Sequence, residues 1–128
     1  MNPIVEEWVR KASADLQTAK REARVRRNPN PDAVCFHAQQ AVEKMLKARL
    51  ALMHRDIPRT HDLTQLLDAL LDAEPLWEAW RPALDELVSY AVEFRYPGEM
   101  ATKQMAKHAL KKAVAICREI HASLNSDS

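Results

Sequence analysis

Apolar residues recur along most of the chain at spacings of three and four positions, which is the period of a helix with one buried face. Runs of this kind predict helices over about 3–27, 31–54, 61–73, 82–93 and 99–124, with a short turn carrying two tryptophans before the fourth. The runs are rich in Ala, Leu, Lys, Arg, Glu and Gln, which lose little side-chain freedom in a helix. We therefore expect an all-α protein, an antiparallel up-and-down bundle of four to five helices.

Seven prolines and a single glycine mark the joints between these helices. Asn2 and Asn30 each precede a proline, so each is expected to cap a helix whose first position is that proline. Thr60 is expected to cap the third helix. The sharpest break is expected around Gly98, because glycine adopts turn conformations that other residues avoid.

The apolar stripe of each helix predicts which residues form the core. The expected inward residues are Val5, Trp8, Ala12, Leu16, Ala19, Ala23, Val34, Ala38, Ala41, Val42, Met45, Leu52, Leu63, Leu66, Leu67, Leu70, Leu84, Leu87, Val88, Ala91, Met105, Ala109, Ala113, Ile116, Ile120 and Leu124. Phe36 lies outside the inward arc of the second helix, where a monomer would leave it exposed. Exposed aromatic side chains often mark an interface, so we expect a homodimer that buries the outer face of this helix.

Composition adds bounds on the class of protein. The 128 residues, 47% of them apolar, predict one domain over 1–124 and a frayed tail over 125–128. A formal charge of +1 predicts no general attraction to nucleic acid or anionic lipid, so any basic site must be local. We expect a cytoplasmic protein, because the amino terminus lacks a secretion signal and no apolar run approaches the roughly 20 residues of a membrane span. Cys35 and Cys117 have no metal-ligand spacing, so we expect buried thiols, no metal and no cofactor.

A polar flank on the second helix is the first candidate for binding chemistry. His37, Gln40 and Lys44 follow one another at spacings of three and four, beside the apolar arc. Ligand sites in helical bundles are often built from such flanks, so these residues are candidates for binding a nucleotide or another anion. The alternative is that long polar side chains merely fringe the core and keep their tips in water.

Two joints supply further candidates. Arg59 and His61 stand at the start of the third helix, where they could bind an anion or belong to a capping arrangement with Asp62. Arg95 lies between Phe94 and Tyr96, where it could hold a phosphate or a base, or cap the fourth helix. Basic residues also cluster at the end of the first helix and along the last, where they form either solvated faces or contacts to nucleic acid: Lys20, Arg21, Arg24, Arg26, Arg27, Lys103, Lys107 and Lys111.

Three segments in this order resemble the prokaryotic HEPN domain proteins, whose name stands for higher eukaryotes and prokaryotes nucleotide-binding. The segments are 33–50 with its His-Ala-Gln-Gln-Ala-Val-Glu-Lys core, Arg-Thr-His-Asp-Leu at 59–63, and Phe-Arg-Tyr-Pro-Gly at 94–98. The likeness spans about 6–122. It implies an antiparallel helical bundle that dimerises and works with a small nucleotidyltransferase, often as a toxin–antitoxin-like pair.

The resemblance also implies a choice between two functions. Many HEPN domains are metal-independent ribonucleases with an Arg-x(4–6)-His motif, in which the histidine is the acid–base and the arginine stabilises phosphate charge. Arg95 stands about where the motif arginine belongs, but the next histidine, His108, is thirteen positions on. Arg55 and His61 have five residues between them, but they fall in the joint before the third helix.

The incomplete motif favours a non-catalytic, dimeric partner of a small nucleotidyltransferase that binds a nucleotide. The alternative is a metal-independent endoribonuclease that acts on RNA with Arg95, or with the Arg55/His61 pair. A third interpretation is a purely structural bundle.

Overall fold

The structure, a computed structural model, describes residues 1–94 and 96–126. It is 73% helical, and the described residues form no strand. The helices are α1 (Pro3–Ala23), α2 (Pro31–Leu52), α3 (Leu63–Asp68), the 3₁₀ helix η1 (Pro75–Trp80), α4 (Arg81–Glu93) and α5 (Lys103–Ser126). The all-α class expected from the sequence is confirmed.

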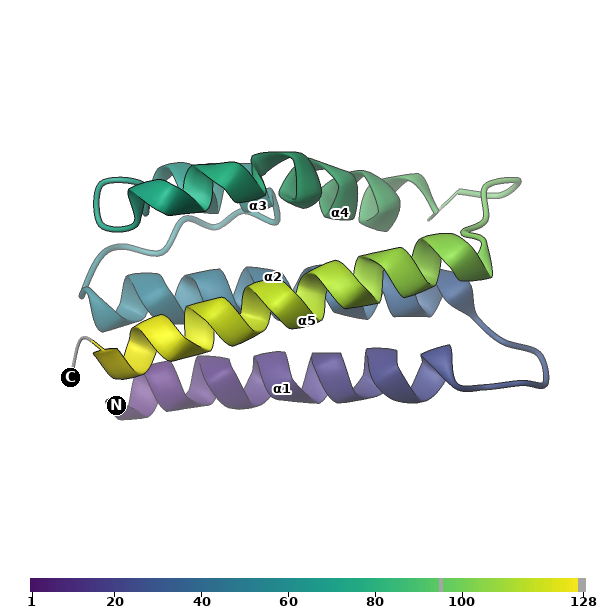
Figure 1. Cartoon of the computed structure of the whole chain (residues 1–128), viewed down its shortest axis with the longest axis horizontal. Helices are drawn as coiled ribbons and strands as arrows, with labels where there is room; N and C mark the ends of the chain where they lie inside the picture. The colour runs from purple at the N-terminus through teal and green to yellow at the C-terminus, as the bar shows by residue number, and fades with distance from the viewer. Residues whose placement is uncertain (95, 127–128) are drawn as a thin grey trace.

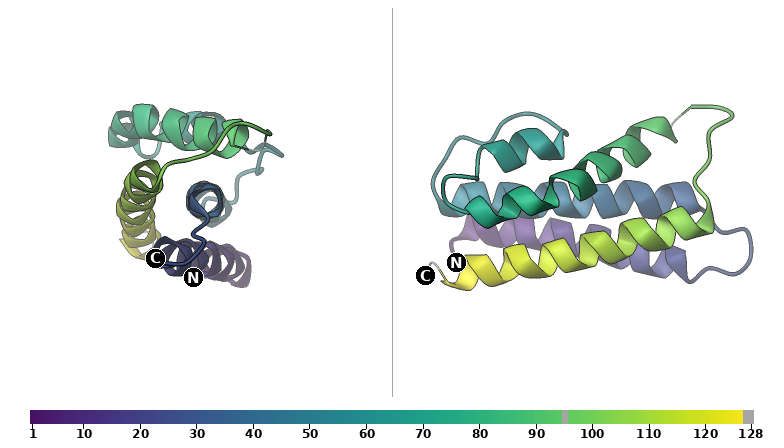
Figure 2. Two further views of the ribbon diagram at one scale, coloured as in Figure 1. Left: turned by 90° about the vertical axis from the view of Figure 1, so that its right-hand side faces the viewer. Right: turned by 45° about the horizontal axis from the view of Figure 1, so that its top comes forward.

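The four long helices run alternately up and down (Figure 1). α2 lies in the middle, with α1, α5 and α4 packed on three of its sides (Figure 2, left). No helix of the described chain covers the fourth side of α2, which the connection to α3 crosses. The connections α1–α2 and α4–α5 lie at the same end of the bundle (Figure 1).

The first two helices begin as their sequences predict. Asn2 Oδ1 accepts a hydrogen bond from the Val5 N–H at 2.9 Å, and Asn30 Oδ1 accepts one from the Ala33 N–H at 3.2 Å. In both helices a proline occupies the first helical position, where its missing N–H costs nothing. The two Asn-Pro pairs therefore set the starts of α1 and α2.

The third helix is shorter than expected and has a different cap. Asp62 caps α3, because its Oδ1 accepts from the Thr64 N–H at 3.0 Å. The Thr60 hydroxyl instead accepts from the Asp62 N–H at 3.0 Å, which holds the turn before the helix. After Asp68 the chain continues as turns, so the helix expected over 61–73 is only six residues long.

Other boundaries also differ from the pattern. α1 ends at Ala23 and α2 ends at Leu52, earlier than the expected ends at 27 and 54. Gly98 has φ +90°, which confirms the sharp turn, but α5 begins only at Lys103. The delay is explained by Thr102, whose hydroxyl accepts from the Met105 N–H at 3.0 Å in the manner of a cap. α5 then continues through Ser126, past the end expected at Leu124.

The core is largely the predicted one, with α2 at its centre. Ala41, Met45, Leu70 and Ile116 are buried as expected. Met105 was predicted inward but is 36% exposed, whereas the other predicted core residues of α5 are buried. Residues predicted inward that are only partly buried are Trp8, Leu16, Ala23, Leu52, Val88 and Ala91.

The face of α2 that was predicted to be exposed is covered in the structure. Every residue of α2 is buried or half-buried, because other elements surround the helix. Phe36 is half-buried and lines a pocket together with Tyr90 of α4 and Phe94, which directly follows that helix. The expectation that a monomer leaves Phe36 exposed is therefore wrong. The exposure of Phe36 can no longer be used to argue for a dimer through the outer face of α2.

Candidate functional site

The polar flank of α2 faces a carboxylate on α1. Asp15 is only 12% exposed, and its Oδ1 lies 2.8 Å from His37 Nδ1. Its other oxygen, Oδ2, accepts a hydrogen bond from Lys44 Nζ. A carboxylate only accepts, so His37 carries its proton on Nδ1. Two of the three flank residues predicted to bind an anion thus hold an internal anion instead.

A second buried carboxylate, Glu43, joins α2 to the loop before α3. Its side chain is 4% exposed, with Lys47 Nζ 3.0 Å from Oε2 and His61 Nδ1 3.0 Å from Oε1. Gln39 donates from Nε2 both to Glu43 Oε1 at 3.2 Å and to the His61 carbonyl at 3.1 Å. Buried ions are tolerated when they are paired and hydrogen-bonded in this way.

Gln40 and Trp8 complete this arrangement, which we call the polar cluster: Trp8, Asp15, His37, Gln39, Gln40, Glu43, Lys44, Lys47 and His61. Gln40 Nε2 donates to Gln39 Oε1 at 2.8 Å, so it supports the residue that holds the His61 loop. The Lys47 ammonium lies 5.6 Å from the centre of the Trp8 ring, within cation–π range. The cluster therefore spans α1, α2 and the α2–α3 loop.

The charges of the polar cluster balance internally. Asp15 and Glu43 supply two negative charges, and Lys44 and Lys47 supply two positive ones. A phosphate could bind to Lys44 only by competing with Asp15. Anion binding at His37, Gln40 and Lys44 stays a prediction, and this geometry does not favour it.

His61 is the one member of the polar cluster that projects into solvent. Its side chain is 83% exposed, yet its Nδ1 is fixed by the buried Glu43 carboxylate. Since Nδ1–H donates to a carboxylate, the neutral ring presents Nε2 as an acceptor. A carboxylate-oriented histidine is a suitable general base, provided that a group to stabilise phosphate charge stands beside it.

Neither of the candidate arginines that the structure describes, Arg55 and Arg59, is bonded to His61. Arg55 is engaged elsewhere: Nη1 and Nη2 lie 2.7 and 2.6 Å from the two oxygens of Asp72, and Nη1 donates to the Ala69 carbonyl at 2.8 Å. The hydrogen bond raises the pKa of Arg55 and lowers the pKa of Asp72. Arg59 is exposed, and Arg95 lies outside the described residues.

The remaining candidates are engaged or buried. His108 Nε2 lies 3.3 Å from Glu86, and the Tyr90 hydroxyl donates to the same carboxylate at 2.5 Å, which raises the pKa of Tyr90 to about 12. Burial raises the pKa of Cys35 to about 11 and that of Cys117 to about 12, so both free thiols are protonated at neutral pH.

Metal and membrane sites are not found in the part of the chain that the structure describes. Residues 1–94 and 96–126 contain no group of three or more His, Cys, Asp or Glu side chains that could hold a metal ion. Among the same residues, no helix combines the length and the apolar character that a membrane crossing requires.

The sequence identified His37, Gln40, Lys44 and His61, and the structure gathers them in one cluster. It missed Asp15, Gln39, Glu43 and Lys47. A signal was present for Glu43 and Lys47, which stand four positions apart within the most apolar part of α2. Asp15 gave no comparable signal, because its partners lie 22 and 29 residues away in the chain.

Comparison with known families gives a match over nearly the whole chain. The family model described as HEPN domain matches residues 5–123. Neither the curated proteins nor the solved structures yield a significant match.

Proposed function

The chain belongs to the HEPN domain family, and we propose that it is a non-catalytic, dimeric partner of a small nucleotidyltransferase that also binds a nucleotide. The observation that carries the proposal is that the candidate catalytic side chains Arg55, His61 and His108 are each bonded to a carboxylate and not to one another. Arg55 is bound to Asp72 and the Ala69 carbonyl, and His61 is bound to Glu43. His108, the first histidine after Arg95, is paired with Glu86. The Arg55/His61 pair is thus engaged with other residues, and Arg95 has no histidine at the spacing that the ribonuclease motif requires.

A surface for association lies at the junction of α4 and α5. Val92, Tyr96 and Met100 are 53%, 64% and 75% exposed, and all three fall within one short stretch of chain. Tyrosine and methionine are enriched at the centres of protein interfaces. We place the dimer contact here rather than on α2, in the cytoplasm where a nucleotidyltransferase partner would act.

Dimerisation predicts a mass of twice 14.6 kDa by light scattering at micromolar concentration. The double substitution Tyr96→Glu and Met100→Glu should return the protein to the single-chain mass, because it places charge in a desolvated contact. Leu76→Glu is the matched control, since Leu76 is 87% exposed on η1. A wild type that stays at the single-chain mass as its concentration rises contradicts the dimer.

The partner is tested first by the neighbouring gene, which we expect to encode a small nucleotidyltransferase. The two proteins, co-expressed with a tag on one of them, should co-purify at a fixed ratio. If a neighbouring nucleotidyltransferase fails to co-purify in either tagging order, the partner proposal is wrong.

A ribonuclease is the second candidate, favoured by the exposed ring of His61 on its buried carboxylate. Arg95 has no histidine within the six positions that the motif allows, and loss of acid–base help typically costs about 10²–10⁴ in rate. Among the residues that the structure describes, no arginine is bonded to His61. We therefore expect no more than background cleavage of RNA by the purified protein in the presence of a metal chelator.

The same assay is applied to His61→Ala, and His121→Ala, at an exposed histidine of α5, is its control. If wild type and His121→Ala cleave RNA while a folded His61→Ala does not, His61 is catalytic and the non-catalytic proposal fails.

A further inference from the structure

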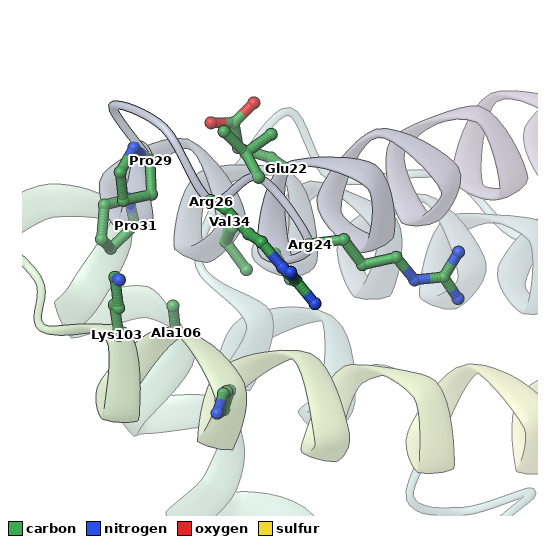
Figure 3. Close-up of a pocket in the computed structure, with 11 residues that line it drawn as sticks. Glu22, Arg24, Arg26, Pro29, Pro31, Val34, Lys103 and Ala106 are labelled. Atoms are coloured by element: carbon green, nitrogen blue, oxygen red, sulfur yellow. The ribbon is translucent and has the colours of Figure 1, made fainter.

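A pocket of about 410 Å³ opens between the α1–α2 connection and the first turns of α5 (Figure 3). Its lining includes Arg24 and Arg26 from the connection and Lys103 and Lys107 from α5. In Figure 3, Arg26 and Lys103 extend into the space between the two segments. Two basic stretches that are far apart in the sequence thus meet around one cavity.

Four of the five charged residues that line this pocket are basic. In the described part of the chain, none of their side chains forms a hydrogen bond or an ion pair. The acidic residue of the lining, Glu22, has a carboxylate that accepts from the Asn30 N–H at 3.0 Å, and it points away from α5 in Figure 3. This is the opposite of the polar cluster, where each lysine is neutralised. A concave surface on which one sign of charge predominates concentrates ions of the other sign.

Both walls of the pocket are fixed to the start of α2. Glu22 ties the α1–α2 connection to the Asn30 amide. On the other side, Asp32 Oδ1 accepts from the Ala101 N–H at 2.6 Å, a contact between residues 69 positions apart. Val34 and Ala106 are buried and form an apolar floor. Because the walls are held without a ligand, little ordering is lost when a ligand enters.

From this geometry we infer that the pocket binds the phosphate chain of a nucleoside triphosphate or another oligophosphate. Arginine and lysine are the residues that bind phosphate oxygens through charge-assisted hydrogen bonds. The volume of about 410 Å³ falls within the usual range for small-molecule sites. The first turn of α5 has lysine and no acidic residue, although negative charge is favoured at a helix start. The inference rests on the nucleotide-binding part of the proposed function, and it supplies the location and the chemistry of that site.

The test is calorimetric titration of the purified full chain with ATP, inorganic triphosphate and adenosine. We expect ATP and triphosphate to bind and adenosine not to bind. If ATP binds more tightly than triphosphate, the ligand is a nucleotide; if the two bind equally, the ligand is an oligophosphate in general. The double variant Arg26→Ala/Lys103→Ala should weaken binding by about tenfold or more, the effect of losing charge-assisted hydrogen bonds.

The matched control is Arg10→Ala/Lys112→Ala, which removes the same charge from exposed positions that do not line the pocket. An equal loss of affinity in this control overturns the site, because the binding would then follow net charge alone. A folded Arg26→Ala/Lys103→Ala that still binds ATP like the wild type overturns the site, while nucleotide binding elsewhere stands. Thermal unfolding with triphosphate gives a second readout, since a ligand of the folded state raises the midpoint in the wild type and not in the pocket variant.

Two further outcomes also overturn the inference. The first is that a single-stranded RNA oligomer binds whereas triphosphate does not. The second is that the protein co-purifies with its nucleotidyltransferase but binds neither ATP nor triphosphate, in which case the partner proposal survives without this site.

Discussion

Glu43→Ala is expected to lower the free energy of unfolding by about 3–5 kcal/mol, the usual cost of removing one member of a buried ion pair. Glu43 and Lys47 are 4% and 10% exposed, so the lysine would be left as an uncompensated charge in the interior. His61 and Gln39 would lose the same acceptor. Urea unfolding followed by circular dichroism measures the difference.

The chain supplies a control with the same spacing. Glu7 and Lys11 form an i, i+4 pair at 3.6 Å whose side chains are about 60% exposed. Glu7→Ala should change stability by no more than about 0.5 kcal/mol, as is usual for exposed pairs. Comparable losses for Glu43→Ala and Glu7→Ala would mean that water reaches Glu43 and that the polar cluster is not a buried network.

A second large effect is expected for Met45→Ala. Met45 is 3% exposed in the middle of α2, and truncation of a buried methionine to alanine typically costs about 2–5 kcal/mol because it leaves a cavity. The counterpart is Met105→Ala, at a residue that is 36% exposed on α5, which should cost less than about 0.5 kcal/mol. Denaturant unfolding of both variants checks the assignment, and equal losses would contradict the helix phase of α5.

These two methionines also indicate what the sequence could predict. Local signals were sufficient to predict a helix start where a single residue can act as the cap, as with the asparagines before Pro3 and Pro31. They were insufficient where neighbouring residues compete, because Asp62 rather than Thr60 caps α3 and Thr102 delays the start of α5. Met105 is helical with either start, and Ala106 beside it is buried in its place.

The sites required information that a single helix does not contain. The flank of α2 was visible in the sequence, but its partner Asp15 lies on α1. The basic stretches on either side of the pocket were visible as separate segments that looked solvated, and only the packing of α5 beside the α1–α2 connection brings Arg26 and Lys103 together. Basic residues that are dispersed along the sequence are thus gathered at one pocket in the folded protein.

The central position of α2 has a consequence for how the protein folds. α1, α3, α4 and α5 all pack against α2, and α1 and α5 each make a far larger contact with α2 than with each other. No subset of helices that omits α2 keeps a substantial core, so partly folded forms gain little stabilisation. Such an arrangement favours all-or-none cooperativity, in which the outer helices are lost together with the helix that they surround.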